Sequence, residues 1–276
     1  MIKIENVDFK YKEGKEVLKN INLSIQQGEF ISIIGKNGSG KSTLARLIAA
    51  ITKPTSGNIL IDDLDTKDSK KFLDIRKKIG IVFQNPENQI IFGKVYDDMA
   101  FALKNLNMDN ANTRISKALE QVGMSKYEQE ESFSLSLGQK QRITIASVLA
   151  VDTPYLVFDE PTAMIDPKGK EEIYKIVREL KKQGYTIIYI TNVIDEILLS
   201  DKVIIMENGE IAHTFNKTDI MEHIEEIEEC QIKIPTIVKT VMELEKNGIK
   251  IQPKEWTLEE LIKEIVKVCK ERKDEK

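Results

Sequence analysis

The segment GKNGSGKST, residues 35–43, has the residue types and spacing of a phosphate-binding loop. Its glycines let successive backbone N–H groups surround phosphate oxygens, and the helix expected to follow adds the partial positive charge of its N-terminus. Lys41 is placed to reach the β- and γ-phosphates, and the Ser42 hydroxyl is placed to bind Mg²⁺. The residues expected to hold the nucleotide phosphates are Gly35, Asn37, Gly38, Ser39, Gly40, Lys41, Ser42 and Thr43.

A second segment with chemical potential is YLVFDEPT, residues 155–162. Its apolar run ends in Asp159, whose carboxylate is expected to complete the shell of the Mg²⁺ ion. Glu160 follows directly and is placed to polarise an attacking water as a general base. Two acids at a strand end are often only a solvated loop or a helix cap. Together with a phosphate loop, they predict a site that hydrolyses nucleoside triphosphates.

The elements that must position these residues alternate between apolar strands and segments of helical period. Strands are expected at 2–9, 30–35, 58–62, 80–84, 155–160, 186–191 and 202–215, and helices at 42–51, 112–123, 137–150 and 169–184. The later strands are nearly continuous apolar runs, as in parallel strands covered by helices on both faces. This pattern predicts an α/β domain with a mainly parallel sheet, flanked by antiparallel structure in the first 30 residues and at 61–65.

A composition shift near residue 221 indicates a C-terminal helical appendage. One helix is expected to start behind Pro235 and end at Gly248, and a second opens with Thr257 and Glu260 at capping-box spacing. The residues expected on one apolar face of the second helix are Leu258, Leu261, Ile262, Ile265 and Val268. The expected units are a main domain over 1–220, with a helical subdomain at about 85–150, and the appendage over 221–276.

The composition, 41% hydrophobic and 31% charged, is that of a soluble globular protein. A net charge of −4 argues against a surface for nucleic acid. No apolar run approaches the roughly 18–20 residues that span a bilayer, and the N-terminus has no signal-peptide pattern. Cys230 and Cys269 lie far apart in the sequence, which favours reduced thiols in the cytoplasm. Any contact with a membrane is therefore expected to be made through partners.

Together with the phosphate loop and YLVFDE, three further segments resemble, in order and spacing, the motifs of the ATP-binding-cassette (ABC) ATPases, across residues 1 to about 220. FSLSLGQKQR (133–142) resembles the signature motif, GIVFQ (80–84) the Q-loop, and AMID (163–166) the D-loop. The resemblance implies a P-loop fold of ABC type, with Tyr11 stacked on adenine and Gln84 acting at the metal and in catalysis. It also implies that ATP lies between one subunit's phosphate loop and the other's signature motif. The residues that face the partner's nucleotide would be Ser136, Gly138, Gln139 and Asp166.

The segment QNPENQIIFGKVYDDMAFALKNLNM, residues 84–108, resembles the Q-loop region of the energy-coupling-factor and cobalt-type importer ATPases, and the helical tail resembles their appendage. The closest likeness is to the first of two paralogous A components. This implies an ATP hydrolase of the translocase class, peripheral at the cytoplasmic face of the cell membrane. Its expected partners are a paralogous ATPase subunit, a transmembrane T component and S components that bind vitamins or metal ions. A homodimer is the alternative to the heterodimer.

One position departs from the family pattern, in which the strand after YLVFDE ends in Thr-His and the His contacts the γ-phosphate. Here that position is Asn192, and the chain's only histidines, His213 and His223, lie downstream. In one interpretation Asn192 is a helix N-cap, and hydrolysis proceeds on Glu160 and Mg²⁺. In the other, which we favour, the site on this chain's own phosphate loop is slow and the partner's site does most of the turnover.

Two other functions fit the ABC resemblance. One is the ATPase subunit of another ABC importer or exporter. The other is a soluble ABC ATPase that acts without a membrane, but the short interval from Ser42 to Asp159 leaves no room for the coiled coil of the chromosome-maintenance members. Translation factors hold two cassettes in one chain, and this chain has one.

Overall fold

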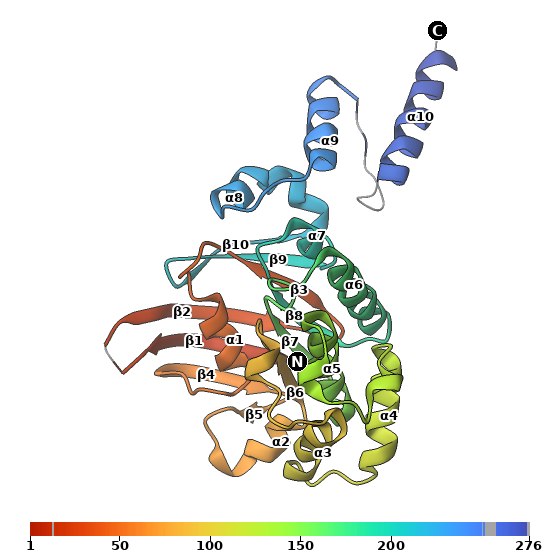
Figure 1. The fold of residues 1–276 in the computed structure, drawn as a ribbon. Helices are drawn as coiled ribbons and strands as arrows, with labels where there is room; N and C mark the ends of the chain where they lie inside the picture. The colour runs from red at the N-terminus through yellow and green to blue at the C-terminus, as the bar shows by residue number, and fades with distance from the viewer. Residues whose placement is uncertain (13, 250, 252–257, 275–276) are drawn as a thin grey trace.

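The structure is a computed structural model that describes residues 1–12, 14–249, 251 and 258–274. Its central sheet has six strands in the spatial order β10-β9-β3-β8-β7-β6 (Figure 1). These strands are β3 (Phe30–Ile34), β6 (Ile79–Val82), β7 (Tyr155–Asp159), β8 (Thr186–Ile190), β9 (Lys202–Glu207) and β10 (Glu210–Asn216). All neighbouring pairs from β9 to β6 are parallel, and only β10 runs antiparallel, to β9. The predicted mainly parallel sheet is confirmed.

The run 202–215, predicted as one strand, is instead the hairpin of β9 and β10. The chain turns at Asn208 and Gly209, whose φ angles are 50° and 86°. Two consecutive residues with positive φ form the tight turn that matches the twist of paired strands, and Asn-Gly is the dipeptide that most favours it. The Asn-Gly pair in the sequence was therefore a signal that the strand prediction overlooked.

A second, four-stranded antiparallel sheet forms the flank, in the order β2-β1-β4-β5. Its strands are β1 (Ile2–Lys10), β2 (Glu16–Ile25), β4 (Ser56–Ile61) and β5 (Leu64–Asp65). The antiparallel flank expected in the first 30 residues and at 61–65 is confirmed.

Helices pack on both faces of the central sheet, and two further helices, α9 and α10, stand away from it (Figure 1). The helices are α1 (Lys41–Ile48), α2 (Phe72–Arg76), α3 (Val95–Asn105), α4 (Ala111–Gln121), α5 (Leu137–Val151), α6 (Pro167–Lys182), α7 (Ile194–Ile197), α8 (Ile224–Glu229), α9 (Thr236–Lys246) and α10 (Leu258–Asp274). Because side chains alternate along a strand, β7 serves two cores. Phe158 belongs to the core formed with α3–α6, and its neighbour Val157 to the core formed with α1 and the antiparallel sheet.

The segment after β10 packs back onto the central sheet. Ile220, Ile224 and Ile227 share an apolar cluster with Ile205 of β9 and with Phe215 of β10. The α8 helix in this segment was not predicted, because the acidic composition of 221–235 gave no clear helical stripe.

Helices α9 and α10 stand beyond this cluster (Figure 1) and share a small core of Val241, Ile251 and Leu261. Gly248 follows α9 with a φ of 76°, so the predicted end of that helix is confirmed. Ile262 was expected on the apolar face of α10, but its side chain is 52% exposed. The predicted cap Thr257 lies outside the described residues. No helix in the described parts of the chain is long and apolar enough to cross a membrane.

Candidate functional site

The predicted chemical residues follow the carboxyl ends of adjacent strands. β3, β8, β7 and β6 are neighbours in this order, and they are parallel. They lead into the phosphate loop, Asn192, Asp159 with Glu160, and Gln84, respectively. Because parallel strands end at one edge of a sheet, segments far apart in the sequence meet there, and such an edge is where open α/β sheets bind ligands.

The phosphate loop closes around its own lysine. The Lys41 side chain is almost fully buried, and its Nζ donates to the Gly35 carbonyl at 2.5 Å and to the Lys36 carbonyl at 3.2 Å. Burial lowers the pKa of Lys41, while the charges of Glu160 and Asp159 oppose that effect. Phosphate oxygens can take the place of both carbonyl oxygens as hydrogen-bond acceptors for the ammonium group, so the lysine is available to an entering nucleotide.

Two glycines of this loop are required by the shape of the chain. A Cβ on Gly35 would lie 2.2 Å from the Met206 carbonyl oxygen, and a Cβ on Gly40 would lie 2.6 Å from Leu18 Cδ2. Gly40 also has a φ of 104°, a conformation that favours glycine, directly before α1. The backbone therefore enters α1 along a path that only glycine allows.

Ser42 and Asp159 lie together below this loop. The Ser42 Oγ donates to Asp159 Oδ1 at 2.9 Å. The Asp159 side chain is buried, which raises the pKa of its carboxyl, although the Ser42 hydrogen bond lowers it. A buried carboxylate oxygen beside a hydroxyl at the phosphate loop is the kind of oxygen pair that Mg²⁺ prefers, so these residues fit a magnesium ion.

Glu160 lies beside Gln84. The Gln84 Nε2 donates to Glu160 Oε2 at 3.2 Å, which joins the segment after β6 to the end of β7. Burial raises the pKa of Glu160, while Lys41 lowers it. A raised pKa strengthens a carboxylate as a base, provided that the group stays ionised at the working pH. Glu160 also has a φ of 50°, and its N–H donates to the Ile190 carbonyl at 3.0 Å, so its backbone is held against β8.

Asn192 contacts the phosphate loop and does not cap a helix. With its amide oriented to donate, the nitrogen lies 3.1 Å from the Gly35 carbonyl and 3.0 Å from the Thr191 carbonyl. The N-cap of α7 is Val193, whose N–H donates to the Thr191 hydroxyl at 2.9 Å. The interpretation of Asn192 as the helix N-cap is therefore wrong, because Val193 is the N-cap, the Thr191 hydroxyl accepts its N–H, and the Asn192 amide faces the loop.

Tyr11 reaches the same edge from the end of β1. Its hydroxyl lies 3.1 Å from the Thr43 Oγ1, and its ring meets Phe9 edge to face with centroids 4.8 Å apart. The side chain is 43% exposed, so the ring remains accessible beside the first turn of α1.

The signature segment and the D-loop lie together on another part of the chain. Ser136 caps α5 in a capping box with Gln139, and Asp166 caps α6 by accepting from the Gly169 N–H at 2.8 Å. A Cβ built on Gly138 would meet Ile165 Cγ2 at 3.4 Å, so the two segments are packed against each other. Within the described residues, no hydrogen bond links Ser136 or Asp166 to the phosphate loop of the same chain.

One buried group at this edge was missed by the sequence analysis. Glu196 of α7 is 1% exposed, and its carboxylate accepts hydrogen bonds from the hydroxyls of Thr162 and Thr191. Burial raises the pKa of Glu196, although the bonds from the two threonines lower it. It thus ties the chain just before the D-loop to the chain just before Asn192. A glutamate on a short helix gives no sequence signal for such a role.

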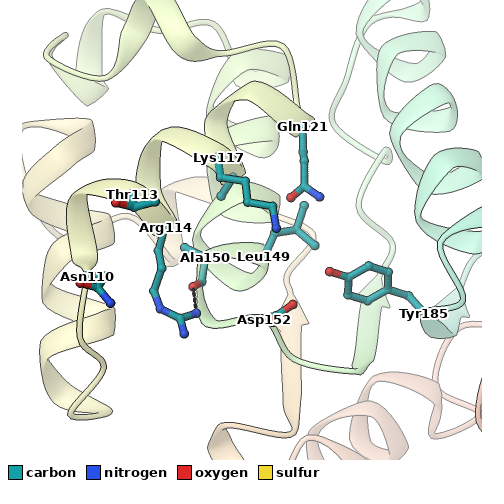
Figure 2. Close-up of a pocket in the computed structure, with 10 residues that line it drawn as sticks. Asn110, Thr113, Arg114, Lys117, Gln121, Leu149, Ala150, Asp152 and Tyr185 are labelled. Carbon is teal, nitrogen blue, oxygen red and sulfur yellow. Dashed lines mark hydrogen bonds between the residues drawn. The ribbon is translucent and has the colours of Figure 1, made fainter.

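A polar cavity of about 290 Å³ lies away from these strand ends, between α4, the end of α5 and Tyr185 (Figure 2). Its charged lining residues are Arg114, Lys117 and Asp152, and the Arg114 guanidinium donates to the Ala150 carbonyl at 3.2 Å. None of the predicted site residues lines it, so it is separate from the nucleotide site.

This geometry agrees with the relatives of the chain. Residues 18–163, just over half of the sequence, match the family model described as ABC transporter. The chain therefore belongs to the ABC transporter family. It is 45% identical over 265 residues to the energy-coupling factor transporter ATP-binding protein EcfA1 of Fusobacterium nucleatum, covering 95% of this chain and 97% of that protein. A second EcfA1, from Caldanaerobacter subterraneus, is 40% identical over 272 residues, covering 96% and 98%. Within the ABC family, this chain is one of the energy-coupling factor ATP-binding proteins.

Two solved structures have the same fold. The first is cbiO1 of Clostridium perfringens, described as part of the ABC transporter complex cbiONQ, with a TM-score of 0.73, 36% identity, and coverage of 87% of this chain and 97% of that one. The second is a dimeric ATP-binding cassette in a post-hydrolysis state bound to ADP and Pi, with a TM-score of 0.71, 32% identity, and coverage of 79% and 99%. The predicted ABC-type P-loop fold is confirmed.

Proposed function

We propose that this chain binds and hydrolyses ATP to power uptake by an energy-coupling factor transporter, as a peripheral subunit at the cytoplasmic face of the membrane. The observation that carries the proposal is the meeting of Lys41, the Ser42–Asp159 pair and the Glu160–Gln84 pair at one sheet edge. Each pair joins residues far apart in the sequence, as a composite catalytic site requires.

In this mechanism the nucleotide phosphates enter the loop and take over the bonds of Lys41 to the Gly35 and Lys36 carbonyls. Mg²⁺, held by Ser42 and Asp159 with Gln84, would neutralise charge on the phosphates. Glu160 accepts a proton from the attacking water, and Gln84, hydrogen-bonded to it, orients that water. Tyr11 offers its accessible ring to adenine.

The second half of each ATP site is proposed to come from a partner ATPase subunit. Ser136, Gly138, Gln139 and Asp166 lie at the starts of α5 and α6, where helix N-termini favour anions. Among the residues that the structure describes, no hydrogen bond joins them to the phosphate loop of the same chain, which fits a role on the partner's nucleotide. The partner is proposed to be a paralogous subunit, with a homodimer as the alternative.

An exposed apolar groove is proposed to receive a transmembrane T component. Ile91 is 73% exposed and Phe133 is 72% exposed, and both line a cavity of about 220 Å³ that Phe92 also borders. A Lys140–Glu87 ion pair of 2.6 Å lines the same cavity. Exposed apolar patches of this kind mark interaction surfaces. Since this segment directly follows Gln84, it is placed to pass movement at the nucleotide to the membrane subunit, and S components would supply the vitamin or metal ion to be carried.

Asn192 is proposed to make this chain's own site slow, since its neutral amide replaces the expected histidine. An ATPase assay of the assembled complex tests both proposals. Glu160→Gln is compared with the equivalent change in the partner, and Lys41→Ala serves as the loss-of-binding control. We expect the partner mutant to lose most of the activity and Glu160→Gln to lose the smaller share. Equal losses would contradict the slow site, whereas full activity with both glutamates replaced would contradict hydrolysis at these sites altogether.

A further inference from the structure

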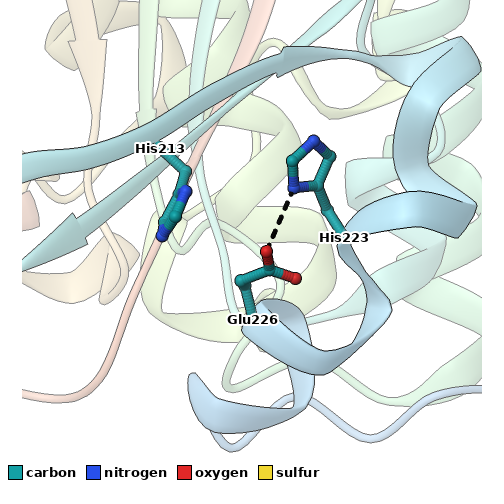
Figure 3. A group of neighbouring side chains, drawn as sticks. All are labelled: His213, His223 and Glu226. Carbon is teal, nitrogen blue, oxygen red and sulfur yellow. Dashed lines mark hydrogen bonds and ion pairs between the residues drawn. The ribbon is translucent and has the colours of Figure 1, made fainter.

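The two histidines of the chain lie beside each other although they belong to different elements. His213 is in β10, and His223 ends the 3-10 helix Lys217–His223, and their ring centroids are 6.2 Å apart. Glu226, in the first turn of α8, faces both (Figure 3). One ligand atom from each of the three residues lies within 4.8 Å of the other two. The sequence contains no further histidine, so the whole imidazole content of the protein gathers at this point.

The local backbone directs these side chains toward one another. The pairing of β10 with β9 shifts register between Ile211 and His213, and a register shift of this kind changes the direction of the side chain next to it. Phe215 lies two residues further along the same strand, and the His223 ring stacks on it with centroids 4.1 Å apart and planes at 14°. His223 Nδ1 lies 3.4 Å from Glu226 Oε1. The imidazole of His223 is therefore held by packing, between the strand and the carboxylate.

We propose that His213, His223 and Glu226 bind a divalent transition-metal ion, for which Zn²⁺ is the best match. Two imidazole nitrogens and one carboxylate oxygen form a ligand set of the kind that Zn²⁺ takes, with water in the fourth position, whereas Mg²⁺ and Ca²⁺ prefer oxygen ligands alone. Metal–ligand distances near 2.1 Å place tetrahedral ligands about 3.4 Å apart. The present spacing exceeds this by less than about 1.5 Å, and the exposed His213 side chain is free to rotate across that gap.

A metal ion at this site would join the central sheet to the segment that leads to the appendage. Phe215, Ile220 and Ile224 already pack together beneath the ligands, so binding needs little further ordering of the backbone. An ion bonded to β10 on one side and to the 217–229 segment on the other would hold that segment against the sheet. The site lies outside the ATP site and uses none of its residues.

Zinc titration of the full, tag-free chain tests the proposal, without nucleotide and with excess Mg²⁺ to occupy Ser42 and Asp159. The exposed thiol of Cys269 is replaced by serine in every sample, because a free thiol also binds Zn²⁺. Calorimetry should show one equivalent bound with micromolar affinity or tighter. Side-chain NMR should show both imidazoles shifting together, which a chain with two histidines reports without ambiguity.

The variants His213→Gln and Glu226→Gln should each weaken zinc binding by at least about tenfold. Glu225→Gln is the matched control, since it removes the same charge from an adjacent exposed residue of α8, and its affinity should stay within twofold. Circular dichroism verifies that the variants fold, and His213, being exposed, is the substitution least able to disturb the core. The proposal is overturned if zinc shifts only one imidazole, if binding is millimolar, or if the folded His213→Gln and Glu226→Gln proteins bind like the control.

Discussion

Replacing Asn192 by histidine should speed hydrolysis at this chain's own site about tenfold. The amide nitrogen of Asn192 lies 3.1 Å from the Gly35 carbonyl, so a donor at this position already faces the phosphate loop. The γ-phosphate is charged, so the hydrogen bond of a neutral amide to it is already charge-assisted, and what an imidazolium adds is a direct attraction between opposite charges. At about 4 Å that attraction is about 1–4 kcal/mol for effective dielectric constants of about 80–20. Even about 1.4 kcal/mol, near the lower end, corresponds to a factor of ten in rate.

The assay is phosphate release by the assembled complex in which the partner's equivalent of Glu160 has been changed to glutamine, so that only this chain's site turns over. We expect kcat to rise about tenfold while the KM for ATP changes less than threefold, because Lys41 and the loop backbone make the contacts of the ground state. Asn192→Gln is the control, since it keeps a neutral amide and should give no increase. A kcat for Asn192→His within twofold of the unmodified protein would refute the assignment of Asn192 to the γ-phosphate position.

Three further predictions concern stability and the metal pair. Gly80→Ala should lower the free energy of unfolding by about 1–3 kcal/mol, because the new Cβ would lie 2.1 Å from Val148 Cγ1. Gly93→Ala is the control, since a Cβ there has nothing within 4 Å, and it should change the free energy of unfolding by less than about 0.5 kcal/mol. Equal effects of the two substitutions in urea titrations would contradict the steric clash at Gly80. Although burial opposes it, Lys78 and the N-terminus lower the pKa of Asp62 to about 2, so its contribution is complete above the ordinary pKa near 3.8 and disappears as the pH falls through 2. Asp62→Asn should thus cost about 1 kcal/mol at pH 7, reduced for solvent screening, and nothing once the pH is well below 2. A cost independent of pH would contradict the ion pair. Asp159→Asn should weaken Mg²⁺-dependent ATP binding by at least about tenfold and leave Mg²⁺-free ATP binding within threefold, measured by fluorescent-nucleotide titration; equal losses with and without Mg²⁺ would place Asp159 outside the metal site.

The phosphate loop and the acids after β7 could be predicted because their chemistry is local. The glycines, Lys41 and Ser42 follow one another within one short segment that opens a helix, so their spacing can be read directly from the sequence. The parallel sheet could be predicted from its apolar strands, since burial on both faces leaves a continuous run of β-branched residues.

What the sequence did not reveal depends on contacts between distant segments. The turn at Asn208 and Gly209 had a local signal that was overlooked, but Glu196 had none, because its partners Thr162 and Thr191 come from two other segments. The convergence of His213 and His223 likewise depends on how the chain returns to the sheet after β10. Asn192 shows the same limit. Its residue type is plain from the sequence, yet only the fold shows that its side chain faces Gly35 and that Val193 is the N-cap of α7.

The packing of Gly138 against Ile165 has a consequence for the timing of the two ATP sites. The Cγ2 methyl of Ile165 would lie 3.4 Å from a Cβ on Gly138 and 2.5 Å from one on Gly169. Because these segments are in contact, we expect the signature segment and the D-loop to move together. In the proposed dimer this pair of segments would grip one nucleotide while it touches the neighbouring site. Opening at one ATP would then change the contacts at the other, so the two sites would be coupled although they turn over at different rates.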